Sequence, residues 1–140
     1  MSKGIYGFKD ETRWLSNFWI CRVPVTTIVI GGKLEVVNLT FSATENAYQA
    51  LKSEDVTDWE QFIAMTPGQT KRNSKDLVMR FGWDSFKDDV MLQLNRIKFF
   101  NNADLMRKLL DTGDQHIEET NTWGDTIGVS VKVKTVSERF

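Results

Sequence analysis

The sequence predicts a single α+β domain that is mostly helical, with short β-strands near its N-terminal end. Two patterns support this prediction. The first forty residues are rich in β-branched and aromatic side chains and contain the pair Gly31-Gly32, which is typical of a hairpin turn. After Ser42, apolar residues recur at spacings of three and four, the period of an amphipathic helix. With 140 residues, 41% of them hydrophobic, the chain has the size and composition of one folded domain.

The expected strands lie before residue 42. Residues 5–8 form a short aromatic run, and residues 18–30 form a longer β-branched run that contains Pro24. Gly31-Gly32 marks a turn, after which residues 34–37 resume the strand pattern. We therefore expect a β-hairpin ahead of the helices.

Two sequences of the capping-box type mark the starts of the first two helices. Ser42 stands three residues before Glu45, and Thr57 stands three residues before Glu60. In such a box the hydroxyl and the carboxylate each accept a hydrogen bond from the other residue's backbone N–H group. We expect one helix from Ser42 and a second from Thr57, ended by Pro67-Gly68.

Pro67 is also expected to begin a short basic helix, because proline is favoured in the first helical turn. The main interpretation of its basic residues is a solvated face, and contact with a phosphate is the alternative: Lys71, Arg72 and Lys75.

The longest helix is expected at residues 85–99. Its apolar residues fall on one stripe at spacings of four, four and three: Phe86, Val90, Leu94 and Ile97. The pair Asn101-Asn102 ends it, and a last helix at residues 103–111 is stopped by Gly113.

Several residues with chemical potential also have a structural interpretation. Glu45 fits a helix cap, Trp83 fits a core residue, and Asp125 fits a turn cap. Three methionines at helical positions are expected in the core: Met79, Met91 and Met106. His116, alone in an acidic stretch, is expected at the surface. From the residues alone both interpretations remain open.

Charge and cysteine content exclude several classes of function. The formal net charge of -1 argues against a general affinity for nucleic acid or for an anionic membrane. Cys21 is the single cysteine and His116 the single histidine, so neither an internal disulfide nor a Cys/His zinc site is expected. No apolar run approaches the roughly 20 residues that span a bilayer. We expect a reduced, soluble, cytoplasmic domain without metal.

Motifs spread along the chain carry a more specific signal. In order they are Phe8 with residues 15–18 (Leu-Ser-Asn-Phe), residues 41–52 (Phe-Ser-Ala-Thr-Glu-Asn-Ala-Tyr-Gln-Ala-Leu-Lys), 83–84 and 87–91 (Trp-Asp and Lys-Asp-Asp-Val-Met), 98–99 (Lys-Phe), 109–114 (Leu-Leu-Asp-Thr-Gly-Asp), and 118–119 and 121–125 (Glu-Glu and Asn-Thr-Trp-Gly-Asp). This series resembles the YbiA-like, or NADAR, family. The resemblance runs from about residue 7 to residue 125.

The resemblance implies an N-glycosidase of YbiA-like fold, in which short N-terminal strands pack on a helical body. The implied substrates are phosphoribosylated or ADP-ribosylated molecules, such as ribosylamino-pyrimidines of riboflavin synthesis or ADP-ribosylated guanine, the latter in nucleic acid. No cofactor is implied. The alternative is a non-catalytic module that binds ADP-ribose or NAD.

The resemblance also implies roles for particular residues. Glu45 and Asp125 are the candidate catalytic carboxylates, since a carboxylate can stabilise an oxocarbenium-like sugar. Lys98 would pair with a phosphate or attack the anomeric carbon as an amine. The implied substrate-binding residues are Asn17, Phe18, Tyr48, Gln49, Lys52, Trp83, Trp123 and Gly124.

The last fifteen residues depart from the family pattern. Residues 126–140 lack the family's Leu-Gly element and final helix, and residues 127–136 alternate valine with polar residues as a strand does. We treat residues 1–140 as one domain with an atypical tail. An inactivating effect of this tail would favour the binding-module alternative.

Overall fold

The structure is a computed structural model that describes residues 5–6, 10–113 and 117–118. The expected strand at residues 127–136 lies outside the described residues. The same is true of four residues singled out in the sequence: His116, Trp123, Gly124 and Asp125.

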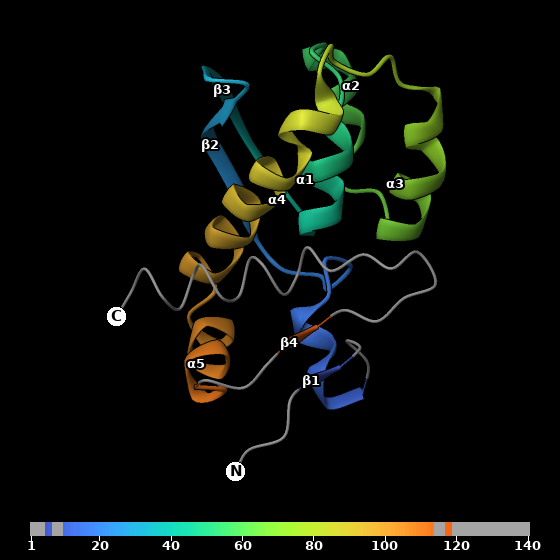
Figure 1. Ribbon diagram of the computed structural model, residues 1–140. Coiled ribbons are helices and arrows are strands. Elements are labelled where there is room, and N and C mark those ends of the chain that lie inside the picture. The colour runs from blue at the N-terminus through green and yellow to red at the C-terminus, as the bar shows by residue number, and fades with distance from the viewer. Residues whose placement is uncertain (1–4, 7–9, 114–116, 119–140) are drawn as a thin grey trace.

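The described chain is an α+β fold in which helices predominate, as expected (Figure 1). The strands are β1 (Ile5–Tyr6), β2 (Val23–Ile30), β3 (Lys33–Phe41) and β4 (Ile117–Glu118). The helices are α1 (Thr44–Ala50), α2 (Val56–Gln61), α3 (Pro67–Asn73), α4 (Trp83–Phe100) and α5 (Ala103–Asp111), with 3-10 helices η1 (Asp10–Leu15) and η2 (Ser74–Asp76).

Strands β2 and β3 form the expected antiparallel hairpin. The turn is Gly31-Gly32, whose φ angles of 61° and 77° lie in the left-handed region that favours glycine. Strand β2 begins at Val23 rather than at residue 18, and Pro24 lies within it, opposite Thr40. Both strands of a two-stranded sheet are edge strands, where proline is tolerated. Separately, β1 pairs in parallel with β4.

The predicted capping box at the start of α1 is wrong. The N-cap is Ala43, which makes no side-chain cap hydrogen bond. The Glu45 carboxylate accepts instead from Gln49, and the backbone N–H of Glu45 donates to the Asn17 carbonyl at 3.0 Å. A carbonyl from a distant turn thus satisfies the N–H donor that a local capping box would use.

The second predicted capping box is also wrong, by two residues. Helix α2 begins after Asp55, whose carboxylate accepts from the Thr57 backbone N–H at 2.9 Å. Because Asp55 takes that N–H, Thr57 lies inside the helix instead of capping it. Helix α3 begins at Pro67 as expected, and its basic residues Lys71 and Arg72 are exposed.

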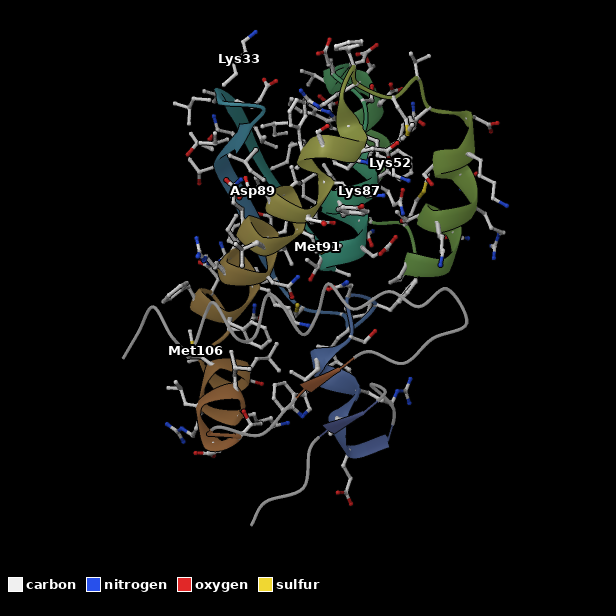
Figure 2. All side chains as sticks on the ribbon, in the orientation of Figure 1. Lys33, Lys52, Lys87, Asp89, Met91 and Met106 are labelled. Atoms are coloured by element: carbon white, nitrogen blue, oxygen red, sulfur yellow. The ribbon has the colours of Figure 1, made fainter. Side chains whose placement is uncertain are left out.

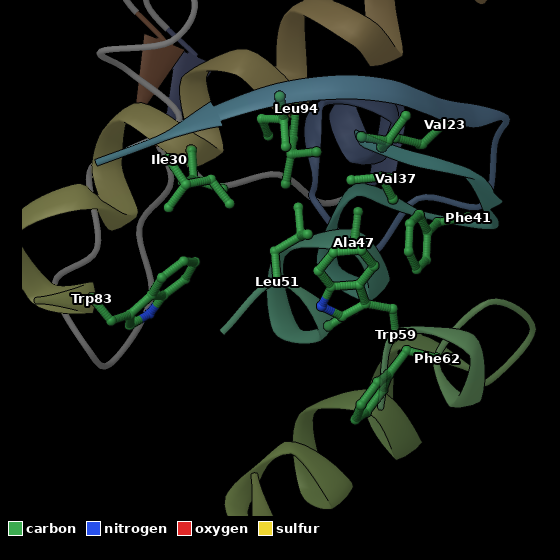
Figure 3. Close-up of a cluster of buried hydrophobic side chains, with 14 residues drawn as sticks. Val23, Ile30, Val37, Phe41, Ala47, Leu51, Trp59, Phe62, Trp83 and Leu94 are labelled. Atoms are coloured by element: carbon green, nitrogen blue, oxygen red, sulfur yellow. The ribbon is translucent and has the colours of Figure 1, made fainter. Parts of the chain in front are cut away.

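The main core lies where α4 and α1 pack on the hairpin (Figures 1 and 3). Figure 3 shows ten labelled members: Val23, Ile30, Val37, Phe41, Ala47, Leu51, Trp59, Phe62, Trp83 and Leu94. Trp83 is only 3% exposed, so its interpretation as a core residue is confirmed.

Helix α4 organises the rest of the chain around this core. It begins two residues earlier than predicted, after Gly82, whose φ is 79°. Of the predicted stripe, Val90 and Leu94 are fully buried. A second cluster joins η1 to α4 and α5 through Trp14, Leu15, Phe99, Leu105 and Leu109. Helix α4 is therefore in contact with both the hairpin and the N-terminal turn.

The methionine prediction holds only in part. Met91 is buried and Met106 is partly buried, but Met79 is 52% exposed. The prediction for Met79 is wrong because residues 78–81 form no helix and lie between η2 and α4.

Candidate functional site

The polar face of α1 forms the centre of the candidate site. Glu45, Tyr48 and Gln49 lie on one side of the helix, and Lys52 follows in the turn after its last residue, Ala50. Figure 2 labels Lys52 close to Lys87, at the side where α1 packs on α4. Met91 and its neighbour Leu92 pack against the Tyr48 ring, so α4 supplies the apolar wall of this face.

Glu45 is buried although its side chain is acidic. It is 7% exposed, and its Oε2 accepts a hydrogen bond of 2.5 Å from Gln49 Nε2. The other amide atom, Gln49 Oε1, is buried and accepts no hydrogen bond from the described residues. Buried acceptors normally have a donor, so this oxygen is a buried acceptor without a partner among the described residues.

A half-buried lysine lies near this carboxylate. Burial lowers the pKa of Lys52, and Glu45 opposes that shift. Lys87 and Lys71 lower the same pKa further, while Asp84 raises it. Lys52 therefore lies among two cations, Lys71 and Lys87, and two carboxylates, of which Glu45 is the buried one.

Aromatic rings connect this polar face to the core. The Tyr48 and Trp83 ring centroids are 5.4 Å apart at an interplanar angle of 51°. Lys52 Nζ lies over the Tyr48 ring, 5.9 Å from its centroid. Trp83 is too deeply buried to offer a broad stacking surface, whereas Tyr48 is half-buried. Direct ligand contact by Trp83 stays a prediction.

The turn after η1 approaches the amino end of α1. The Asn17 carbonyl accepts from Glu45 N–H, and Asn17 Oδ1 accepts from Asn95 Nδ2 at 3.3 Å. Lys98 Nζ donates to the carbonyls of Trp14 at 2.8 Å and Ser16 at 2.9 Å. Burial lowers the pKa of Lys98 to about 8, with Cys21 opposing.

A groove of about 410 Å³ lies along the same turn. Its described lining residues are Arg13, Ser16, Phe18, Trp19 and Ile20. Lys71 Nζ lies 5.7 Å from the centroid of the Phe18 ring, so α3 reaches this region. Exposed aromatic rings next to cations suit a planar, negatively charged ligand.

The structure thus brings together most of the predicted residues that it describes. Glu45, Tyr48 and Gln49 share one face of α1, Lys52 lies near them in the following turn, and Asn17 contacts Glu45 directly. Lys98 does not face this set, because its ammonium is enclosed by the turn carbonyls. Trp123, Gly124 and Asp125 lie outside the described residues.

Sequence reasoning missed Arg13, Trp19, Lys87 and Asn95. The signal in the sequence was the adjacent pair Phe18-Trp19, whose side chains are 41% and 36% exposed. Nothing in the sequence marked Asn95 as the partner of Asn17, 78 residues away.

The residues that the structure describes contain no group of three or more His, Cys, Asp or Glu side chains that could hold a metal ion. None of their helices combines the length and apolar character needed to cross a bilayer.

The chain matches the family profile described as the NADAR domain over residues 6–139. It is 30% identical over 134 residues to a riboflavin biosynthesis protein of Vibrio vulnificus (strain YJ016), covering 89% of this chain and 34% of that relative. It is 44% identical over 46 residues to an N-glycosidase of Acanthamoeba polyphaga mimivirus, covering 30% of this chain and 27% of that relative. The chain thus spans about a third or less of the length of these curated relatives.

The fold is similar to the NMR structure of the E. coli protein YbiA, with a TM-score of 0.73. That match covers 99% of this chain and 89% of the other, at 22% sequence identity, a level that speaks for the fold alone. The family profile covers nearly the whole chain, and the chain belongs to the NADAR domain family.

Proposed function

We propose that this chain is an N-glycosidase, which hydrolyses the bond between a ribose and a base. The observation that carries the proposal is the buried carboxylate of Glu45, beside the cation Lys52 and the amide of Gln49. Family membership and the N-glycosidase name of the mimivirus relative support the same reaction class.

In the proposed reaction, Glu45 stabilises the sugar as its bond to nitrogen breaks. Positive charge then grows on the ribose and negative charge on the leaving nitrogen. Glu45 also orients a water, whose oxygen bonds to the anomeric carbon while the leaving nitrogen ends with a proton. Because Glu45 is buried, solvent screens its charge less than at the surface. Asp125 is proposed as the second catalytic carboxylate.

Lys52, with Lys71 and Lys87 near it, is proposed to hold the phosphate of the substrate. Gln49, whose amide binds Glu45, and Asn17 are proposed to help fix the ribose. The proposed aromatic and backbone contacts to the base are Phe18, Tyr48, Trp83, Trp123 and Gly124.

Two substrate classes fit this proposal. A phosphoribosylamino-pyrimidine is suggested by the riboflavin biosynthesis name of the Vibrio relative. An ADP-ribosylated guanine is larger, and the groove beside Phe18 and Trp19 would offer room and cations for its second half.

The test is to incubate the chain with each substrate and to follow the products by chromatography. Release of ribose 5-phosphate from the first, or of ADP-ribose from the second, is expected for one of them. Calorimetric binding of ADP-ribose without any product would instead identify the non-catalytic module. Neither binding nor product from either class would contradict both functions.

A further inference from the structure

The ammonium group of Lys98 is enclosed inside the protein. The side chain is 0% exposed, and its hydrogen-bond partners among the described residues are the carbonyls of Trp14 and Ser16. Burying a charge is unfavourable even when carbonyl dipoles surround it, which is the cause of the lowered pKa. A methionine could fill a similar volume without this cost, so packing alone does not account for a lysine here.

The turn that Lys98 holds is connected to the candidate catalytic residue. Asn17, next along the chain from Ser16, accepts the backbone N–H of Glu45 at 3.0 Å. The side chain of Asn17 is held in turn by Asn95 at 3.3 Å. Asn95 and Lys98 are three residues apart, on one side of α4. Helix α4 therefore holds the turn at two points, and the turn holds the start of α1.

We propose that Lys98 is a positioning residue: by binding the carbonyls of Trp14 and Ser16, it fixes Asn17 and thereby the position of Glu45. This assignment rests on the proposed function for its catalytic consequence, but not for its structural one. It replaces the nucleophilic role that the family resemblance implied. A nucleophile has to reach the anomeric carbon, whereas Lys98 Nζ faces two backbone oxygens inside the protein.

The first test needs no substrate. Amide hydrogen exchange at Glu45 is measured by NMR in the wild type, in Lys98→Met and in Lys108→Met, whose lysine is exposed on α5. Exchange at Glu45 should accelerate by about tenfold in Lys98→Met, because the acceptor turn loses its anchor. It should stay unchanged in Lys108→Met. Asn95→Ala removes the second anchor and should act in the same direction, which keeps the test available if Lys98→Met does not fold.

The second test uses hydrolysis of whichever substrate the wild type cleaves. In Lys98→Met, kcat should fall by about 10- to 100-fold, with KM changed by less than about threefold, because misplacement of a catalytic group acts on the transition state. Lys98→Arg keeps a cation with N–H donors and should recover part of kcat. A purely structural loss would lower the fraction of folded enzyme, which urea unfolding of each variant measures separately.

Two results would overturn the assignment. One is an unchanged exchange rate at Glu45 in both Lys98→Met and Asn95→Ala. The other is covalent trapping of substrate on Lys98 by borohydride, which would restore the nucleophilic role. If the wild type cleaves neither substrate, the proposed function fails, and the exchange experiment still decides the positioning role.

Discussion

Two buried charged residues, Glu45 and Lys98, contact the backbone of the same turn. Glu45 donates its N–H to Asn17, and Lys98 donates to the carbonyls of Trp14 and Ser16. In the proposed function the Glu45 carboxylate acts on the ligand. The Lys98 ammonium is instead hydrogen-bonded to backbone carbonyls of the turn. At the scale of single residues, a chemically active side chain is thus distinguished by what surrounds it and not by its type.

The buried ammonium makes stability depend on pH in a defined direction. The pKa of Lys98 is about 8 in the folded protein against 10.5 for free lysine, so the unfolded chain binds more protons between these values. Below pH 8 the buried charge lowers the free energy of unfolding by its full amount, about 3 kcal/mol. This destabilisation disappears as the pH rises from 8 to 10.5, because Lys98 loses its proton in the folded protein. Urea unfolding at several pH values should therefore show that the wild type gains stability relative to Lys98→Met as the pH rises from 7 to 10. A difference that stays constant from pH 7 to pH 10 would contradict this.

At the scale of elements, the hairpin and α1 are held against α4 by local contacts that can be tested one at a time. A Cβ placed on Gly31 would lie 2.8 Å from the Phe86 ring of α4, whereas one on Gly32 would meet nothing within 4 Å. Both glycines have positive φ, so both carry the same backbone constraint. Substitutions at Gly31 and Gly32 therefore differ only in the clash with Phe86, which is present at Gly31 and absent at Gly32.

Gly31→Ala should destabilise the protein more than Gly32→Ala. Each substitution costs about 1 kcal/mol from the left-handed backbone, and Gly31→Ala adds about 1–2 kcal/mol by displacing the Phe86 ring. Denaturant unfolding of the two variants measures the difference directly. Equal losses would mean that Phe86 moves aside freely.

Arg80 joins the end of α1 to β3. Its guanidinium binds Glu35 at 2.7 Å and the Leu51 carbonyl at 2.6 Å, and its backbone N–H donates to the Lys52 carbonyl. Arg80→Met keeps the backbone hydrogen bond to Lys52 but removes the donors to Glu35 and to the buried Leu51 carbonyl, and it should cost about 1–3 kcal/mol. Arg72→Met, on the exposed face of α3, should change stability by less than about 0.5 kcal/mol. A loss from Arg80→Met no larger than this would contradict the bridging role.

At the scale of the whole molecule, local sequence patterns predicted most helices and strands. Contacts outside those patterns determined where the helices begin and which groups cap them. The Gly31-Gly32 turn, Pro67 and the Asn101-Asn102 break act within a few residues, so the sequence could reveal them. The two capping boxes were wrong because another acceptor took the N–H group at the helix end, the Asn17 carbonyl in one case and the Asp55 carboxylate in the other.

The candidate site was predictable where it depends on local spacing and not where it depends on long-range contacts. The face of α1 follows from helical spacing, and motif resemblance pointed to Glu45 within it. The enclosure of Lys98 depends on Trp14 and Ser16, more than eighty residues earlier, and no local pattern encodes such a contact. Long-range hydrogen bonds therefore account for most of what the sequence did not reveal.

The most direct test of the account is the hydrolysis rate of Glu45→Gln, which keeps the shape of the side chain and removes its charge. Its kcat should fall by about 10²- to 10⁴-fold, the usual contribution of a positioned carboxylate. Glu60→Gln, on the exposed side of the neighbouring helix α2, is the matched control and should keep the wild-type rate. Wild-type turnover by Glu45→Gln would contradict the central claim that this buried carboxylate drives cleavage of the ribose–base bond.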